Sequence, residues 1–274
     1  MMVSVVNIEA IPPNAESAGL KEAERTLLAR ADLVLAGGRS LYLAKRALHD
    51  NIHEFPSSVE VEHFGRARQT IVEPPDQAAI PHPRIGFYGV IDERLDRELV
   101  ARVAAANPEW HFILIGPIVK IDRAALPVAR NLHYLGPKRY DELPSYLAGW
   151  DVAMLPFARN AATELISPTK TPEYLAAGRP VVSTSIRDVV HPYGEEGFVR
   201  IADTPADFTA AIRWAFSERW HLQWPRVDAF LANNSWDRTW SGIAERLRDA
   251  VVARRISTLA AAEARALTAK RRIH

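Results

Sequence analysis

The chain contains no cysteine and carries almost no net charge, and both absences narrow what it can be. With no thiol among its 274 residues, it forms no disulfide and offers no thiolate as a nucleophile or metal ligand. A formal net charge of +1 creates no field that would favour a nucleic acid or an acidic partner. We therefore expect no nucleic-acid partner. The absence of cysteine fits a reducing compartment, and we expect a cytoplasmic protein.

Long apolar runs and metal-binding spacings are also absent. No run approaches the roughly 20 apolar residues that a membrane-spanning helix needs, and the N-terminus lacks the layout of a signal peptide. The nine histidines, among them His49, His53 and His63, show no metal-binding spacing, so we expect no metal site. Asp249 and Glu263 dilute the basic C-terminal end, which favours a solvated helix face. At most, we expect a peripheral membrane contact there.

The residues present alternate between apolar runs and helix-forming segments. Strands are predicted at 84–89, 111–115, 131–135, 151–155, 180–184 and 197–202, and helices at 94–106, 139–148, 168–177 and 204–217. This alternation predicts an α/β fold, a doubly wound parallel sheet with helices on both faces. Ligands of such sheets bind beyond the carboxyl ends of the strands, where Gly89, Gly116, Gly136 and Pro156 fall. We expect one crevice there.

Four regions are predicted along the chain. Residues 1–65 begin irregularly, with a break at 11–14, and then form a small unit with strands near 31–36 and 51–56. The proline-rich residues 66–83 are predicted to be a linker, 84–235 the main domain, and 236–274 a C-terminal helical tail of one or two helices.

One segment combines a cation, a carboxylate and the start of a helix. Ser167-Pro-Thr-Lys170-Thr-Pro-Glu173 leads through a short helix to Gly178 and a buried strand. The N–H groups of a helix start favour phosphate, Lys170 adds positive charge, and Glu173 can accept hydrogen bonds from sugar hydroxyls. The segment suits a nucleotide diphospho-sugar. A surface lysine and a helix-capping acid remain the simpler alternatives.

Because of Pro172, the sequence allows two different starting points for that helix. Either Ser167 caps the helix and Pro168 begins it, or Thr171 caps it and Pro172 begins it. The second choice makes the helix very short, and the first places a proline where a backbone N–H should bond.

The same segment carries a family resemblance. Pro168-Thr-Lys170 followed by Glu173-Tyr-Leu-Ala-Ala-Gly-Arg-Pro-Val-Val182 resembles the donor-binding segment of GT4-like, group 1 glycosyltransferases with the GT-B fold. Five further motifs follow the order that this family uses: Gly86-Phe-Tyr-Gly89, Trp110-His-Phe-Ile-Leu-Ile-Gly-Pro117, Asn131-Leu-His-Tyr-Leu-Gly136, Leu143-Pro-Ser-Tyr-Leu147 and Asp151-Val-Ala-Met-Leu-Pro156. The resemblance implies that residues 84–235 are the donor-binding domain and residues 1–65 a remnant of the N-terminal acceptor domain.

The resemblance also assigns roles around the segment. It implies that Glu173 binds the ribose hydroxyls. The place of Lys170 in the first turn of the predicted helix, next to Pro168 and Thr169, favours a contact with the diphosphate. The family often has two glutamates with seven residues between them, whereas eight residues separate Glu164 from Glu173. Glu164 is therefore either the first of that pair, shifted by one loop residue, or an ordinary loop acid.

Three further positions are candidates for donor binding. His133 and Gly136 lie where the resemblance places the nucleobase, with contacts mostly through backbone groups. Gly89 allows close approach of a ligand, although a plain tight turn explains it almost as well. The family commonly has an arginine and a lysine after this glycine, but only Arg94 lies near it here, so donor binding would lean more on Lys170.

The resemblance implies glycosyl transfer from a nucleotide diphospho-sugar to an unknown acceptor, a glycan or lipid-linked acceptor of the cell-envelope polysaccharide type. Lys170 and helix N–H groups would stabilise the leaving diphosphate, with no metal and no cofactor. No catalytic base can be named, because most of the acceptor domain would be missing. Two alternatives remain: a nucleotide-sugar-binding half-protein that needs an acceptor-domain partner or a homo-oligomer, and a sugar-nucleotide epimerase, which would need a complete N-terminal domain.

Overall fold

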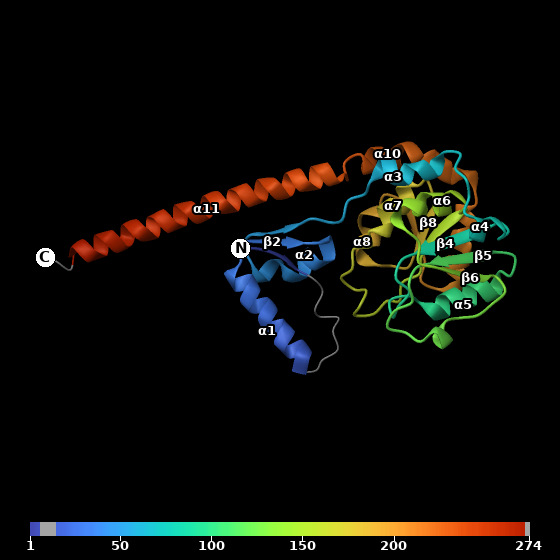
Figure 1. The fold of residues 1–274 in the computed structure, drawn as a ribbon, viewed down its shortest axis with the longest axis horizontal. Helices are drawn as coiled ribbons and strands as arrows, with labels where there is room; N and C mark the ends of the chain where they lie inside the picture. Colours follow the sequence, from blue (N-terminus) through green and yellow to red (C-terminus); the bar gives the residue numbers. More distant parts are fainter. Residues whose placement is uncertain (6–14, 272–274) are drawn as a thin grey trace.

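A computed structural model describes residues 1–5 and 15–271, which fold around two parallel sheets (Figure 1). The larger sheet has six strands in the order β6-β5-β4-β7-β8-β9. The strands are β4 (Arg84–Tyr88), β5 (His111–Ile115), β6 (Leu132–Gly136), β7 (Val152–Leu155), β8 (Val181–Ser183) and β9 (Val199–Ile201). All its pairings are parallel, and the strand order reverses between β4 and β7. The predicted doubly wound α/β fold is therefore confirmed.

Helices cover this sheet on both faces, so its central strands are buried along their whole length. The main helices are α5 (Arg97–Ala106), α6 (Leu143–Ala148), α7 (Lys170–Ala176) and α9 (Pro205–Ala215). Asp96 caps α5 by accepting a hydrogen bond from Leu99 N, and Thr204 caps α9. Every residue of β4 and β7 is buried. Burial on both faces explains why β7 is an uninterrupted apolar run and why β4 carries no polar side chain between Arg84 and Tyr88.

The smaller sheet has three parallel strands in the order β1-β2-β3. These are β1 (Met2–Val5), β2 (Leu33–Ala36) and β3 (Ile52–Glu54), with helices α1 (Ala15–Arg30) and α2 (Arg39–Lys45). Leu28 of α1 and Leu41 of α2 pack on one face of this sheet. Residues 2–5 and 15–20 are thus more regular than the predicted irregular start, while the break predicted at 11–14 lies outside the described residues.

The chain passes between the two sheets near residue 56 and enters α3 (Val61–Gly65), where the Phe64 side chain is completely buried in the main core. Residues 66–83, the predicted linker, contain η3 (Arg66–Arg68) and α4 (Pro75–Ala78) and pack against that core. The amide of Gln77 is buried, donates to Tyr146 O and accepts from Trp150 Nε1, both at 2.9 Å. The domain boundaries themselves stay predictions.

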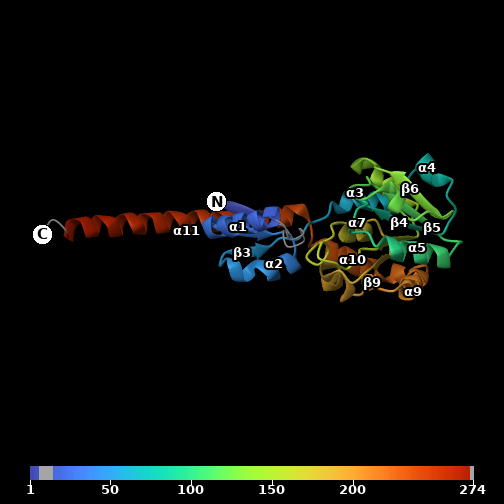
Figure 2. The same cartoon turned by 90° about the horizontal axis from the view of Figure 1, so that it is seen from below.

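The chain returns to the small sheet after α10 (Trp224–Leu231), through one long helix, α11 (Trp236–Arg271). Where it crosses, Val59 N donates to Asn234 O at 3.2 Å, and the Ser58 and Thr239 hydroxyls are 2.6 Å apart. Figure 2 shows α11 running past the small sheet and away from both sheets. No helix among the described residues is long and apolar enough to cross a membrane.

Candidate functional site

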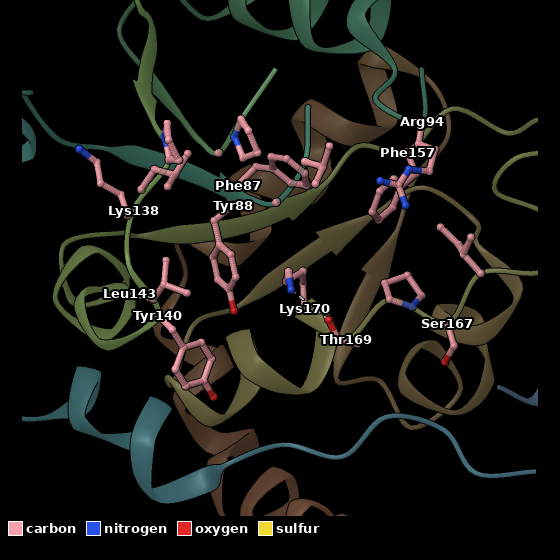
Figure 3. A pocket seen from close by; sticks show the side chains of 18 residues that line it. Phe87, Tyr88, Arg94, Lys138, Tyr140, Leu143, Phe157, Ser167, Thr169 and Lys170 are labelled. Carbon is pink, nitrogen blue, oxygen red and sulfur yellow. Dashed lines mark hydrogen bonds between the residues drawn. The ribbon is translucent and has the colours of Figure 1, made fainter. Parts of the chain in front are cut away.

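A cavity of about 510 Å³ lies at the carboxyl ends of β4, β5 and β6 (Figure 3). This is the point where the strand order reverses, the usual ligand site of a doubly wound sheet. Its walls come from the strand ends, from the loop after β6, from Phe157 after β7 and from residues 166–170, which lead into α7. The predicted crevice therefore exists, and the segment of Lys170 forms one side of it.

Glycines open the floor of this cavity. Gly89 and Gly116 line it, with φ angles of +152° and +143°. A Cβ atom on Gly116 would lie only 1.8 Å from Gly89 O, so no other residue fits there. Gly136, with φ +70°, stands one strand further along, and its carbonyl accepts from Gly116 N at 2.9 Å. Gly89 thus lines the cavity, whereas Gly136 supports its edge.

Lys170, Glu173 and Tyr88 form the centre of the site. Lys170 Nζ lies 3.4 Å from Glu173 Oε2 and 5.1 Å from the centre of the Tyr88 ring. The Tyr88 hydroxyl donates a hydrogen bond to the Glu173 carboxylate. Lys170 and Tyr88 line the cavity, and the Glu173 side chain, which is 12% exposed, lies behind them.

The surroundings of Glu173 change the pKa of its carboxyl group. Burial raises the pKa of Glu173 above its usual value, while Lys170 and the Tyr88 hydroxyl act to lower it. Burial beside this carboxylate also holds the pKa of Tyr88 well above its usual value. The end of β4 is held in turn by Tyr174, whose hydroxyl accepts from Tyr88 N at 2.9 Å. The buried Tyr174 side chain thus fixes the end of β4 that carries Tyr88.

The start of α7 differs from both predicted alternatives. Thr169 is the residue before the helix, and Lys170 is its first residue, two positions later than the predicted 168–177. Pro172 therefore falls in the first turn, where backbone N–H groups have no partner within the helix. This position accommodates a proline at low cost and places Lys170 at the cavity wall.

Three cations line the cavity, and among its described lining residues there is no carboxylate: Arg94, Lys138 and Lys170. The Arg94 Nη2 atom is held 2.7 Å from Asp92 Oδ2, and Lys138 Nζ lies 2.6 Å from Asp76 Oδ2. Sequence reasoning missed Lys138. Its position two residues after Gly136, in a loop that must border the crevice, was the signal available.

Tyr140 was also missed. Its ring is stacked on His63, with 4.3 Å between the ring centres and an angle of 5° between the planes. Burial raises the pKa of Tyr140 to about 12, and nearby Glu60 and Glu173 act in the same direction. Figure 3 shows Tyr140 and Lys138 at one end of the cavity and Arg94 and Ser167 at the other.

Besides Glu173 and Gly136, two predicted candidates lie outside the cavity wall. The His133 imidazole hydrogen-bonds to His111 at 3.0 Å, and burial lowers the pKa of both rings. Glu164 forms an ion pair with Arg187 at 3.0 Å in a separate surface loop. Pro168 and Thr169, by contrast, line the cavity as expected. Within the described residues, no group of three or more histidine or acidic side chains is placed to hold a metal ion.

The family model described as glycosyl transferases group 1 matches residues 82–218. A curated relative, the putative teichuronic acid biosynthesis glycosyltransferase TuaH of Bacillus subtilis (strain 168), is 30% identical over 207 residues, which cover 70% of this chain and 50% of TuaH. The chain thus spans about half the length of this curated relative.

Solved structures share the fold at low identity. Anabaena Alr3699/HepE, in complex with UDP and glucose, is 13% identical with a TM-score of 0.71, over 90% of this chain and 71% of that chain. The sucrose-phosphate synthase (tll1590) of Thermosynechococcus elongatus is 15% identical with a TM-score of 0.70, over 92% of this chain and 68% of that chain.

Proposed function

Because the chain belongs to the group 1 glycosyltransferases, we propose that it binds a nucleotide diphospho-sugar beside Lys170 and transfers the sugar to an acceptor. One observation carries this proposal: Arg94, Lys138 and Lys170 line a cavity that holds no carboxylate among its described lining residues. Lys170 and Arg94 suit a diphosphate, whose charge each can meet with a charge-assisted hydrogen bond, and Lys138 adds positive charge at the other end of the cavity.

The residues at the two ends of the cavity favour one orientation of the donor. Tyr140 and Lys138 at one end suit the nucleobase, because an aromatic ring offers a flat face and Lys138 a hydrogen-bond donor. The diphosphate would lie beside Lys170, and the sugar near Ser167 and Thr169 at the other end. Glu173 would bind the ribose by sharing its carboxylate between Tyr88 and a hydroxyl of the ligand.

In this scheme, catalysis depends on stabilising the leaving diphosphate. When the bond between the anomeric carbon and the diphosphate oxygen breaks, negative charge develops on the diphosphate. Lys170 and Arg94, already positioned by Glu173 and Asp92, would stabilise that charge without reorganising. TuaH is described as a putative teichuronic acid biosynthesis glycosyltransferase, which supports the acceptor class that we propose: a cell-envelope polysaccharide, as a glycan or lipid-linked acceptor.

A second candidate function is supported by the small sheet, which has three strands among the described residues. Such a chain would bind the nucleotide sugar but transfer it only with an acceptor-domain partner or a second copy. Donor binding with no transfer to any acceptor would favour this second function over the first.

Thermal stabilisation by a panel of UDP-, GDP-, ADP- and dTDP-sugars tests the donor site directly. A selective rise in the unfolding temperature with one member supports the site and identifies the base. UDP-glucose belongs in the panel because HepE has been solved in complex with it.

The variant Lys170→Ala should weaken nucleotide binding by about 10- to 100-fold, since a hydrogen bond to a charged group contributes about 1.5–3 kcal/mol. Titration calorimetry with the selected nucleotide measures this change. Arg102→Ala is the control, because Arg102 is an exposed cation of α5 that pairs with Glu98 and lies away from the cavity. An unchanged affinity in Lys170→Ala would remove the proposed role of this residue.

A further inference from the structure

The long helix α11 changes its surroundings where it leaves the small sheet. Up to Ala250, one side of the helix packs on that sheet, with Ile243 and Leu247 in one apolar cluster with Leu35. From residue 251 to residue 265 every side chain is exposed, and Figure 1 shows this half of α11 extending beyond both sheets. Because helices in proteins gain most of their stability by packing one face, this half of α11 is suited to contact with a partner.

Large apolar side chains are among those that this half exposes. Val251, Val252, Ile256 and Leu259 are between 50% and 66% exposed. They lie within three turns of one helix, so their side chains form a continuous surface. Neighbouring exposed apolar side chains mark surfaces that bind a protein or a membrane.

Six residues form a stripe along this half of the helix, which we call the basic-apolar face: Arg248, Val251, Val252, Arg255, Leu259 and Ala262. Successive members are one, three or four residues apart, so the stripe spans about 100° of the helix surface. The acids Asp249 and Glu263, which dilute the basic charge in the sequence, fall outside this stripe. The argument for a solvated helix face therefore does not apply to this side of α11.

The guanidinium groups on this side are available to an anion. Arg248 and Arg255 form no ion pair among the described residues, and neither does Arg30 at the end of α1. Arg30 and Arg255 line an open groove of about 920 Å³ between the start of β1 and α11. Met1 and Met2 line the same groove and are about half exposed. Apolar and cationic side chains of the small sheet thus continue the basic-apolar face.

The charge of this region decides between possible partners. Residues 246–265 contain five arginines and two acids, so two copies of the segment side by side would repel each other. A nucleic acid would meet the arginines but leave Val251, Val252 and Leu259 in water. An anionic lipid surface attracts the arginines and also removes the apolar side chains from water.

We propose that the basic-apolar face of α11, together with Arg30 and the adjoining groove, is a docking surface for an anionic phospholipid bilayer. The helix would lie along the bilayer, with Val251, Val252 and Leu259 among the upper parts of the acyl chains. Arg248 and Arg255 would extend to the lipid phosphates. This inference goes beyond the proposed function and does not depend on the donor site. Docking there would bring the chain to the surface where a lipid-linked acceptor lies.

Flotation of the full chain with lipid vesicles tests this inference. The anionic vesicles contain equal parts of phosphatidylglycerol and phosphatidylcholine, and the neutral vesicles contain phosphatidylcholine alone. We expect at least tenfold tighter binding to the anionic vesicles, because each cation near such a surface raises the affinity about fivefold. Equal binding to both kinds of vesicle, or binding to neither, would overturn the inference.

A charge reversal locates the surface. Arg255→Glu should weaken binding to the anionic vesicles about 25-fold, because it changes the charge of the face by two units. The matched control is Arg246→Glu, the same charge change on the opposite side of α11, where Arg246 pairs with Asp249. Because physiological salt screens charges beyond about 8 Å, this control should bind within about threefold of wild type. Equal losses in the two variants would overturn the assignment to the basic-apolar face.

Leu259→Ser distinguishes a lipid surface from other anions. The substitution changes an exposed side chain, and it should weaken vesicle binding at least threefold while leaving any binding of duplex DNA unchanged. Tighter binding of duplex DNA than of anionic vesicles would assign the face to a nucleic acid and overturn the inference.

Titration of the wild type with UDP, made in parallel, keeps the two proposals separate. UDP binding without vesicle binding would overturn this inference alone. Vesicle binding without UDP binding would overturn the proposed donor site alone.

Discussion

At the residue scale, Glu173 depends on neighbours that differ widely in sequence distance. Lys170 lies three residues before it on the same helix, so the pair is visible in the sequence. Tyr88, which donates to the same carboxylate, lies 85 residues away on β4. Lys170 supplies positive charge to the cavity wall, while the Tyr88 hydroxyl orients the largely buried carboxylate of Glu173.

Glu173→Gln should stabilise the protein at neutral pH and weaken donor binding. Because burial raises the pKa of Glu173 above its usual 4.5, the folded wild type loses stability as pH rises through that raised value. Glutamine does not titrate, so its advantage should be present near pH 7.5 and vanish near pH 3.5. Losing a charged acceptor for the ribose should cost about tenfold in affinity.

Thermal unfolding at the two pH values, with calorimetry at neutral pH, measures both effects. Unfolding temperatures of Glu173→Gln and wild type that differ equally at both pH values would contradict the argument from burial.

At the scale of secondary-structure elements, the glycines of β4 serve different purposes. Gly89 at the end of the strand opens the cavity, whereas Gly86 in its middle makes room for a ring. A Cβ atom on Gly86 would lie 2.0 Å from the Trp150 indole. The motif Gly86-Phe-Tyr-Gly89 therefore combines a packing requirement with a ligand-facing position.

Gly86→Ala should destabilise the protein by about 1–3 kcal/mol, the usual cost of overpacking a well-packed core. Gly65→Ala is the control at the end of α3, where nothing lies within 4 Å of the added Cβ. There the same change should stabilise by about 0.5–1 kcal/mol, since alanine suits a helix better than glycine. Urea unfolding measures both. Equal effects of the two substitutions would contradict the role assigned to Trp150.

At the scale of the whole molecule, two chain crossings and helix α2 hold the small sheet against the larger one. The chain crosses twice, near residues 56 and 235, and α2 adds the hydrogen bonds from Ser40 to Asp188. Gly38 packs so closely there that a Cβ atom would lie 2.4 Å from Asp188 Oδ2 and 2.6 Å from Ser167 Cβ. Ser167 also lines the cavity at the ends of β4, β5 and β6, so the position of the small sheet shapes that cavity.

Gly38→Ala should push the small sheet away from Asp188, at a cost of about 1–3 kcal/mol to that contact. The expected result is at least tenfold faster hydrogen exchange of the Ser40 amide, which donates to Asp188. Gly37→Ala is the matched control, because nothing lies within 4 Å of a Cβ atom at the adjacent glycine. Equal protection of Ser40 in the two variants would show that the contact does not depend on this close packing.

The sequence by itself determined the α/β class and placed the six strands of the larger sheet within about two residues, because strands buried on both faces are largely apolar runs, and four of these six end at or just before a glycine or proline. It also placed Lys170, Pro168 and Thr169 at the cavity, since their segment links two such elements. Local residue patterns reflect burial and chain direction, so these features can be predicted without knowing how the elements pack.

Only the tertiary structure decided the rest. Packing decides that α7 begins at Lys170 and that Lys138 and Tyr140 lie in the cavity wall. It also decides that the His133 ring bonds to His111 and that Glu164 pairs with Arg187. It also joined Ser40 to Asp188 across 148 residues of sequence. Such contacts depend on which faces meet when the elements pack, and no local pattern of residues contains that information.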